Sequence, residues 1–274
     1  MNYNKIFIPC DTELAEILIA VLSEAGYEGF LEREDGLEVY ADEEHFSLEF
    51  FTKTIAQYLP DPSFSVEVLE KKNWNEEWEK NYQPVIVENH CLIRTPFHQL
   101  SQSFPLEIII IPKMSFGTGH HATTYMMVQH LLTFNLESKR VLDAGCGTAI
   151  LSIVAEKKGG EEIVAFDVDP WCIENGQENI SLNDCHRIQL QLGSTDEMNY
   201  TVPFDLILAN INKNILLKAM GNFAAHLNPE GSLLLSGFYG HDRLDLTDLA
   251  SHYGLVQVGG MERDLWATLW FKKA

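Results

Sequence analysis

The stretch that most constrains the fold is "RVLDAGCGTAILSIVAEKKGG", residues 140–160, which predicts a short apolar strand, a glycine turn and a helix. Gly145 and Gly147 let the backbone of that turn approach a ligand closely, and they leave N–H groups of the helix pointing at it. Strands followed by helices recur from residue 84 onward, with further strands at "EIVAFDVD", "IQLQLG", "FDLILANI" and "GSLLLSGF". This alternation predicts an α/β fold with a mostly parallel sheet. The stretch "GLVQVGGMERDLWATLWFKK" near the end predicts two antiparallel strands.

Residues 1–70 have a different pattern and predict a small α+β domain. Strands are expected at "NKIFIP", "GFLERE", "GLEVYA" and "FSVEVLE", the second and third joined by the turn "REDG". One helix is expected between Asp11 or Thr12, as its N-cap, and Gly26; a second spans roughly residues 45–59. The order βαββαβ is the ferredoxin-like arrangement.

Residues 71–83 form a linker between this domain and the α/β domain, residues 84–274. Trp74, Trp78 and Tyr82 recur at four-residue steps, which places them on one face of a helix. Such aromatic side chains either anchor the linker on a domain or contact a substrate.

Charge and cysteine usage restrict the partners. The chain has a formal net charge of −21, and residues 1–83 carry −13 of it, from 6 Lys+Arg and 19 Asp+Glu. Direct nucleic-acid binding is disfavoured because it relies on basic residues, whereas an acidic front domain suits a basic partner.

No apolar stretch is long enough to span a membrane, and no secretion signal is evident. The five cysteines form no CxxC pair, which argues against structural zinc or a disulfide framework and favours the cytoplasm.

The glycine turn favours a nucleoside without a pyrophosphate. Ile150 occupies the third glycine position of the dinucleotide fingerprint, and no Gly-Lys-Ser/Thr follows that would make a P-loop. Asp167 lies 22 residues after Gly145 at a strand tip, where a carboxylate can accept the hydroxyl protons of a ribose. Asp143 is expected to receive a cationic amine. Amine, ribose and base together describe S-adenosylmethionine. The alternative for Asp167 is a capping carboxylate, and Asp169 is either a ligand or the N-cap of the next helix.

Asn210 ends the strand "FDLILAN" and can both donate and accept hydrogen bonds, although asparagine is also common in turns. Methyltransferases that act on nucleic-acid bases or glutamine amides typically have Asn-Pro-Pro-aromatic here. This chain has Asn-Ile-Asn-Lys, residues 210–213, without a platform on which a planar group could stack. An aliphatic amine is therefore the expected substrate.

Five stretches in order, "FGTGHHATT", "VLDAGCGTAILSIVAEKKGG", "AFDVDPWCIENGQENISLN", "FDLILANI" and "LLLSGF", resemble the ribosomal protein L11 methyltransferase (PrmA) family over roughly residues 72–271. The resemblance implies a ferredoxin-like domain that grips the ribosomal protein. It also implies a Rossmann-like domain that transfers methyl groups from S-adenosylmethionine to lysine side chains and the N-terminal amine. Family cofactor contacts carry over onto Thr124, Gly145, Asp167 and Asn210. Ala149 stands where the family usually has glycine, and Trp266 keeps a family tryptophan.

"FGTGHHATT" is expected to be a loop over the cofactor followed by a helix that begins at Thr123 or Thr124. The adjacent histidines, His120 and His121, are expected to point apart, and no nearby Cys, Asp or Glu would complete a zinc site, so no metal is expected. We place Gly117, Thr118, Gly147 and Ser194 among the cofactor-binding residues, and Asn210, Phe116 and His121 along the catalytic channel. The alternatives are a methyltransferase of another protein or a small molecule, or an inactive binding module. We expect a monomer.

Overall fold

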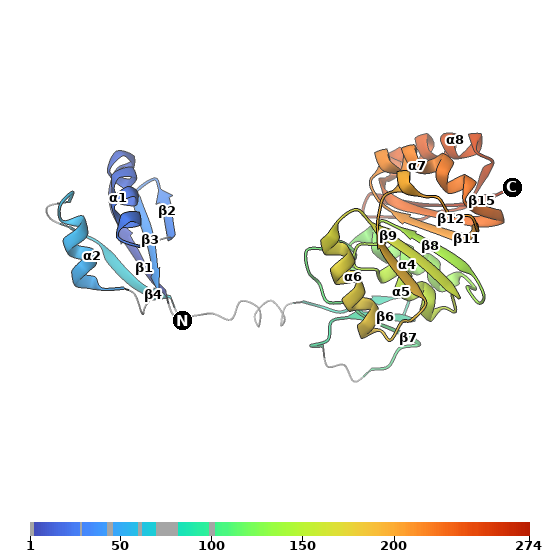
Figure 1. Ribbon diagram of the computed structural model, residues 1–274, viewed down its shortest axis with the longest axis horizontal. Coiled ribbons are helices and arrows are strands. Elements are labelled where there is room, and N and C mark those ends of the chain that lie inside the picture. The colour runs from blue at the N-terminus through green and yellow to red at the C-terminus, as the bar shows by residue number, and fades with distance from the viewer. Residues whose placement is uncertain (1–2, 28, 43–45, 60–61, 70–81, 99–101) are drawn as a thin grey trace. The chain divides into compact units, whose positions relative to one another are not determined.

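The computed structural model describes residues 3–27, 29–42, 46–59, 62–69, 82–98 and 102–274. The chain divides into two compact units, residues 1–81 and 82–274 (Figure 1). Most of the expected linker, including Trp74 and Trp78, lies outside the described residues.

The first unit has the predicted βαββαβ order. Its elements are β1 Tyr3–Ile8, α1 Thr12–Glu24, β2 Gly29–Arg33, β3 Gly36–Asp42, α2 Leu48–Ile55 and β4 Ser65–Leu69. The sheet has the order β2-β3-β1-β4 with antiparallel neighbours, as in ferredoxin-like domains. Helix α1 begins where the sequence predicts, because the Asp11 side chain accepts a hydrogen bond from Leu14 N at 2.9 Å. Side chains of both helices and of one sheet face, such as Leu18, Phe51 and Val39, form the core.

The second unit is built on an eight-stranded sheet. Its strands are β8 Arg140–Ala144, β9 Glu162–Asp167, β10 Ile188–Leu192, β11 Phe204–Asn210, β12 Leu227–Tyr239, β13 Leu255–Gly259, β14 Glu262–Arg263 and β15 Trp266–Lys273. The order is β10-β9-β8-β11-β12-β15-β13, with β14 beside β15. The first five strands of this row, β10, β9, β8, β11 and β12, run parallel to one another. Strand β15 runs antiparallel to both of its neighbours, β12 and β13. The predicted fold class is therefore confirmed.

Helices cover both faces of this sheet (Figure 1). They are α4 Ala122–Thr133, α5 Ile150–Lys157, α6 Pro170–Leu182, α7 Lys213–Ala225 and α8 Arg243–His252. Helices α7 and α8 pack on one apolar cluster with Phe166 and Leu235, while α4, α5 and α6 pack on the other with Val141 and Leu208. Alternation along buried strands sends side chains to both clusters, which explains the nearly continuous apolar runs of the sequence.

A small sheet that the sequence did not predict precedes α4. It consists of β5 Val85–Val87, β6 Cys91–Arg94 and β7 Leu106–Ile109, in the order β5-β6-β7. Strands β5 and β6 are antiparallel, whereas β6 and β7 are parallel. Strand β7 leads into the segment 110–121 that carries "FGTGHH".

Among the described residues, no helix is both long and apolar enough to cross a membrane.

Candidate cofactor site

A cavity of about 550 Å³ opens at the carboxyl ends of β8, β9 and β11. Strand β8 lies between β9 and β11, so the chain reverses its direction of winding at this point, where α/β sheets bind ligands. The cavity wall is formed by Met114, Phe116, Gly145, Gly147, Phe166, Asp167, Val168, Asp169, Cys172, Ser194, Thr195, Asp196, Asn210, Ile211, Ile215 and Lys218. Six of the predicted site residues are among them: Phe116, Gly145, Gly147, Asp167, Ser194 and Asn210.

The glycine turn, Gly145–Thr148, needs glycine at both predicted positions. Gly145 and Gly147 have φ of +72° and +54°, which L side chains rarely adopt. A Cβ on Gly147 would lie 2.2 Å from the carbonyl oxygen of Phe116, and one on Gly145 would lie 2.3 Å from Ile211 Cγ2. The turn is therefore packed tightly between the segment before α4 and the residue after β11.

Asp167 ties β9 to this turn. One carboxylate oxygen accepts a hydrogen bond from Gly147 N at 2.9 Å, and the other accepts from Asp169 N at 3.0 Å. Each oxygen keeps a further lone pair for a ligand hydroxyl. Asp169 is the N-cap of α6, accepting from Trp171 N at 2.9 Å, and it also lines the cavity.

Asn210 lines the cavity, and its side chain carries a buried acceptor without a partner among the described residues. Its Nδ2 lies 3.5 Å from Thr124 Oγ1, and its Oδ1 is buried without a hydrogen-bond partner in the described part of the chain. A buried acceptor left unpaired is costly, so a ligand that donates a hydrogen bond to it would be favoured. Thr124 is fully buried and does not line the cavity; it holds the Asn210 amide from behind.

Asp143 lies behind the turn instead of on the cavity wall. It is 1% exposed, and its Oδ2 accepts hydrogen bonds from Ser152 N at 3.0 Å and Ser152 Oγ at 2.6 Å. Burial raises the pKa of this carboxyl to about 6. Its Oδ1 is buried and has no partner among the described residues. The structure therefore brings Asp143 to the glycine turn without exposing it to the cavity.

The segment from Phe116 to Thr118 packs on the glycine turn. Thr148 N donates to Phe116 O at 2.9 Å, and Thr148 Oγ1 donates to Gly117 O at 2.6 Å. Gly117, with φ of +109°, is buried against Thr148. Thr118 is half-buried, and its Oγ1 lies 3.3 Å from His120 Nδ1 and away from the cavity wall. Only Phe116 of this segment reaches the cavity.

The adjacent histidines have separate structural roles. His120 Nε2 lies 2.8 Å from Gln83 O. His121 is the N-cap of α4, and its Nδ1 accepts from Thr123 N at 3.3 Å. The prediction that α4 begins at Thr123 or Thr124 is therefore wrong: it begins at Ala122, because a histidine takes the cap position that threonine usually takes. Within the described ranges, no three His, Cys, Asp or Glu side chains are placed to hold a metal ion.

Three further aromatic side chains continue from Phe116, on the cavity wall, as a row of ring contacts. Ring centroids are 5.2 Å apart for Phe116 and His121, 4.8 Å for His121 and Trp266, and 4.3 Å for Trp266 and Tyr239. We call these four residues the aromatic row. Burial lowers the pKa of His121, so its ring is neutral at neutral pH. Sequence reasoning missed Tyr239, which joins the row only because β12 pairs with β15 in a register that places Tyr239 opposite Trp266.

Ser194, a predicted site residue, donates from its N and Oγ to Glu197 Oε2 at 2.8 and 3.1 Å. Its neighbours on the wall, Thr195 and Asp196, were missed. Val168, Ile211 and Ile215 add apolar surface. Val168 and Ile211 come directly after predicted strands, and a place after a strand end was the sequence signal that could have found them.

The chemistry of the wall fits a nucleoside without phosphates. The wall contains three carboxylates, Asp167, Asp169 and Asp196, and one lysine, Lys218. Carboxylates in this number disfavour a pyrophosphate and favour hydroxyls or positive charge. The glycine turn gives close backbone approach, and Asn210 lines the same wall.

Fold and site together define the class of Rossmann-like methyltransferases that use S-adenosylmethionine. Solved structures share the fold: a methyltransferase from Pyrococcus furiosus superposes with a TM-score of 0.52 at 20% identity, covering 61% of this chain and 89% of that one. The ribosomal protein L11 methylase of Lactobacillus delbrueckii subsp. bulgaricus superposes with a TM-score of 0.65 at 26% identity, over 70% of this chain and 100% of that one.

The sequence comparisons identify the family. The model of the ribosomal protein L11 methyltransferase (PrmA) family matches residues 24–274. The ribosomal protein L11 methyltransferase of Phocaeicola vulgatus is 39% identical, covering 96% of this chain and 95% of that protein. The enzyme of the same name from Porphyromonas gingivalis is 42% identical, covering 93% and 90%. The chain therefore belongs to the ribosomal protein L11 methyltransferase family, as the resemblance implied.

Proposed function

We propose that this protein transfers methyl groups from S-adenosylmethionine to amines of ribosomal protein L11, both lysine side chains and the N-terminal amine. The observation that carries the proposal is the nucleoside-sized cavity at the glycine turn, which Asn210 lines. The Oδ1 of Asn210 is buried and has no hydrogen-bond partner among the described residues. An amine N–H is the kind of donor that this oxygen lacks. Family membership points to L11 as the protein that supplies the amine.

The cofactor contacts are assigned in two groups. Gly145, Gly147, Asp167 and Ser194 line the cavity and are proposed to touch the nucleoside, with Asp167 accepting from the ribose hydroxyls. Four residues outside the wall are proposed to shape it: the buried Asp143, Thr124 and Gly117, and the half-buried Thr118. When bound, S-adenosylmethionine supplies an electrophilic methyl group on a sulfonium sulfur.

The protein's own task is to bring a neutral amine into line with that methyl group. A lysine amine has a pKa of about 10.4 in water and is mostly charged near pH 7. An apolar wall such as the Phe116 ring disfavours the charged form, and Asn210 Oδ1 accepts one N–H so that the nitrogen lone pair is free to attack. The ammonium proton leaves to water before attack. Bound in the cavity, S-adenosylmethionine would supply the methyl group, and Asn210 and Phe116 would keep the amine nitrogen directed at it.

The aromatic row offers a path for the incoming side chain. Phe116 lies on the cavity wall, and His121, Trp266 and Tyr239 continue from it at ring spacings below 5.5 Å. Aromatic faces attract ammonium groups and their methylated forms. We assign Asn210, Phe116 and His121 to the catalytic channel, and we add Trp266 and Tyr239 as its outer wall.

Recognition of the protein substrate is assigned to residues 1–70. Their described surface exposes carboxylates at Asp11, Glu13, Glu16, Glu24, Glu32, Glu34, Asp35, Glu49 and Glu67. Such a surface attracts a basic ribosomal protein and speeds its encounter with the enzyme. We propose that the enzyme acts as a monomer in the cytoplasm on the protein itself, without direct contact with nucleic acid or a membrane.

The test is incubation of the protein with isotope-labelled S-adenosylmethionine and purified L11, followed by peptide mass spectrometry. We expect label on lysine side chains and on the N-terminal amine, and none on L11 whose amines have been acetylated beforehand. Deletion of residues 1–70 should reduce labelling of L11. Undiminished labelling by the shortened protein would remove the recognition role, and absence of label on L11 with wild-type protein would refute the proposed substrate.

A further inference from the structure

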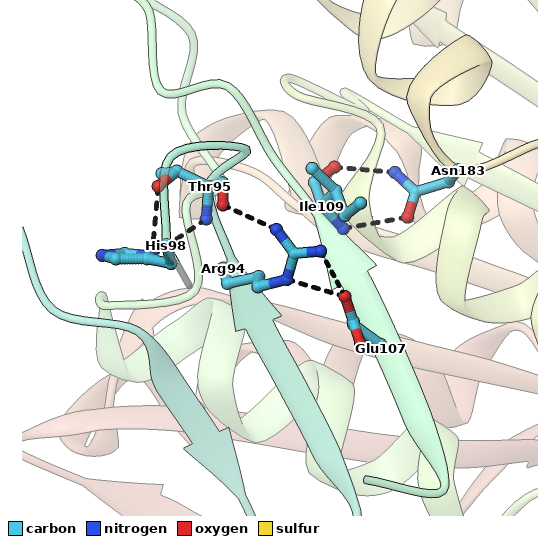
Figure 2. Close-up of polar contacts among 6 residues, drawn as sticks. All are labelled: Arg94, Thr95, His98, Glu107, Ile109 and Asn183. Atoms are coloured by element: carbon cyan, nitrogen blue, oxygen red, sulfur yellow. Dashed lines mark hydrogen bonds and ion pairs between the residues drawn. The ribbon is translucent and has the colours of Figure 1, made fainter. Parts of the chain in front are cut away.

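Strand β7 is held firmly along the edge that faces β6. Ile110 N, just after the strand, donates to Arg94 O at 2.8 Å. The Arg94 guanidinium contacts Glu107 Oε1 through both Nε and Nη2, each at 2.6 Å (Figure 2). A charge-assisted, two-nitrogen contact of this kind fixes the two strands relative to each other.

The other edge of β7 faces a helix, and an asparagine side chain replaces a neighbouring strand there. Figure 2 shows the Asn183 amide meeting the backbone of Ile109: its Oδ1 accepts from Ile109 N at 2.9 Å, and its Nδ2 donates to Ile109 O at 2.6 Å. Asn183 is the C-cap of α6 and is 5% exposed. These two bonds satisfy backbone groups that would otherwise be buried and unpaired.

Asn179, one helical turn earlier, extends this arrangement to the glycine turn. Its Oδ1 accepts from Ile111 N at 2.9 Å, and its Nδ2 donates to Thr148 O at 3.1 Å. Asn179 is fully buried. One amide therefore joins the segment that leaves β7 to the turn that begins α5, whereas the bonds of Asn183 go to Ile109 and to Asn179 O.

The segment from Ile111 to Phe116 is short, and hydrogen bonds fix both of its ends. Only residues 112–115 separate Ile111 from Phe116, whose carbonyl accepts from Thr148 N at 2.9 Å. Thr148 thus contacts Asn179 through its carbonyl and Phe116 through its N–H. The position of the Phe116 ring on the cavity wall depends on how both ends of this segment are held.

We propose that Asn179 is a positioning residue for the cofactor site: it sets the spacing between the glycine turn and the segment 112–117, and thereby the affinity for S-adenosylmethionine. The proposal rests on the proposed function. Asn183 anchors the same strand from the same helix but contributes only to stability, because it does not touch the turn.

The test compares Asn179→Ala with Asn183→Ala in the full-length protein, with Kd for S-adenosylmethionine measured by calorimetry and Tm by thermal unfolding. Each variant removes buried hydrogen bonds, so both should lower Tm. Asn179→Ala loses the hydrogen bonds that join Thr148 to Ile111, so its Kd for S-adenosylmethionine should rise by about 10-fold. The Kd of Asn183→Ala should stay within about 2-fold of the wild-type value. Equal Kd values for the two variants would overturn the role of Asn179, and no binding by wild type would instead refute the proposed function.

A second measurement needs no variant and stays informative if Asn179→Ala does not fold. Coupling between two sites is reciprocal, so bound S-adenosylmethionine should stabilise the Asn179 contacts. Amide exchange of Ile111, whose N–H is bound by Asn179, should slow on binding by a larger factor than that of Ile109, whose N–H is bound by Asn183. The same factor at both amides would overturn the proposal.

Discussion

The Nδ2 of Asn210 lies 3.5 Å from the Oγ1 of Thr124. The amide oxygen of the same side chain, Oδ1, is buried and has no hydrogen-bond partner among the described residues. Asn210 ends β11 and lines the cavity, while Thr124 is buried in the first turn of α4. Two elements far apart in sequence thus fix the orientation of one amide. A ligand that donates a hydrogen bond to Oδ1 would satisfy this buried acceptor.

Replacing Asn210 by alanine should cost activity much more than stability. The change removes an acceptor that is unpaired in the fold, so unfolding free energy should fall by less than about 1 kcal/mol. Methyl transfer should fall by about 100-fold, because the amine is no longer oriented. Steady-state kinetics and thermal unfolding of the purified variant measure both. A variant that methylates at the wild-type rate would contradict the assignment of Asn210.

Replacing Gly147 by alanine should damage both the fold and cofactor binding. The new Cβ would lie 2.2 Å from Phe116 O at a residue with φ of +54°, which should cost more than about 2 kcal/mol. Gly254→Ala is the matched control, with φ of +73° but no atom within 4 Å of the added Cβ. It should cost only about 1 kcal/mol and leave Kd for S-adenosylmethionine unchanged. Equal losses in the two variants would contradict close packing at the turn.

Replacing Trp266 by alanine should weaken binding of the protein substrate more than binding of the cofactor. Trp266 lies 4.8 Å from the His121 ring and 4.3 Å from the Tyr239 ring, in the proposed outer wall of the channel. Loss of one aromatic face for a cationic side chain should raise KM for L11 by about 3- to 30-fold. Trp270→Ala, on the same strand but packed on Phe134, should lower Tm and leave that KM unchanged. The reverse pattern would exclude the aromatic row from substrate contact.

The buried carboxyl of Asp143 should make stability depend on pH. Its pKa is raised from 3.8 to about 6 in the folded protein, so the folded state holds this proton more tightly than the unfolded state. Unfolding free energy should therefore fall as pH rises from about 4 to about 6, and this group should add no further change above that range; the total is about 3 kcal/mol. Asp143→Asn cannot titrate, so its stability relative to wild type should rise by that amount. Urea unfolding at several pH values measures the difference; a constant difference would contradict the raised pKa.

Local sequence signals predicted the elements that position the cofactor site. The glycine turn, the strand that ends at Asp167 and the strand that ends at Asn210 were all expected, because glycine spacing, apolar runs and capping carboxylates are local features. The residues themselves indicated S-adenosylmethionine and an amine substrate, and the family resemblance then indicated the ribosomal protein that carries the amine. Asp143 was placed on the correct strand, but its burial depends on the Ser152 contacts and could not be derived from the pattern.

Two features that depend on which strands pair, and in which register, were not predicted. The parallel pairing of β6 with β7 joins strands separated by residues 95–105, and nothing in either short strand indicates its partner. The contact of Tyr239 with Trp266 depends on the register of β12 and β15. His121 was missed as a helix cap because histidine is not among the residues preferred at that position.

The most direct test of the account is a crystal structure of the full chain with S-adenosylhomocysteine, the product left after methyl transfer. We predict the nucleoside in the cavity at the carboxyl ends of β8, β9 and β11, with its ribose hydroxyls within hydrogen-bond distance of Asp167 and its sulfur facing Asn210. A nucleoside bound elsewhere on the chain, with Asp167 and the glycine turn making no contact to it, would contradict the account.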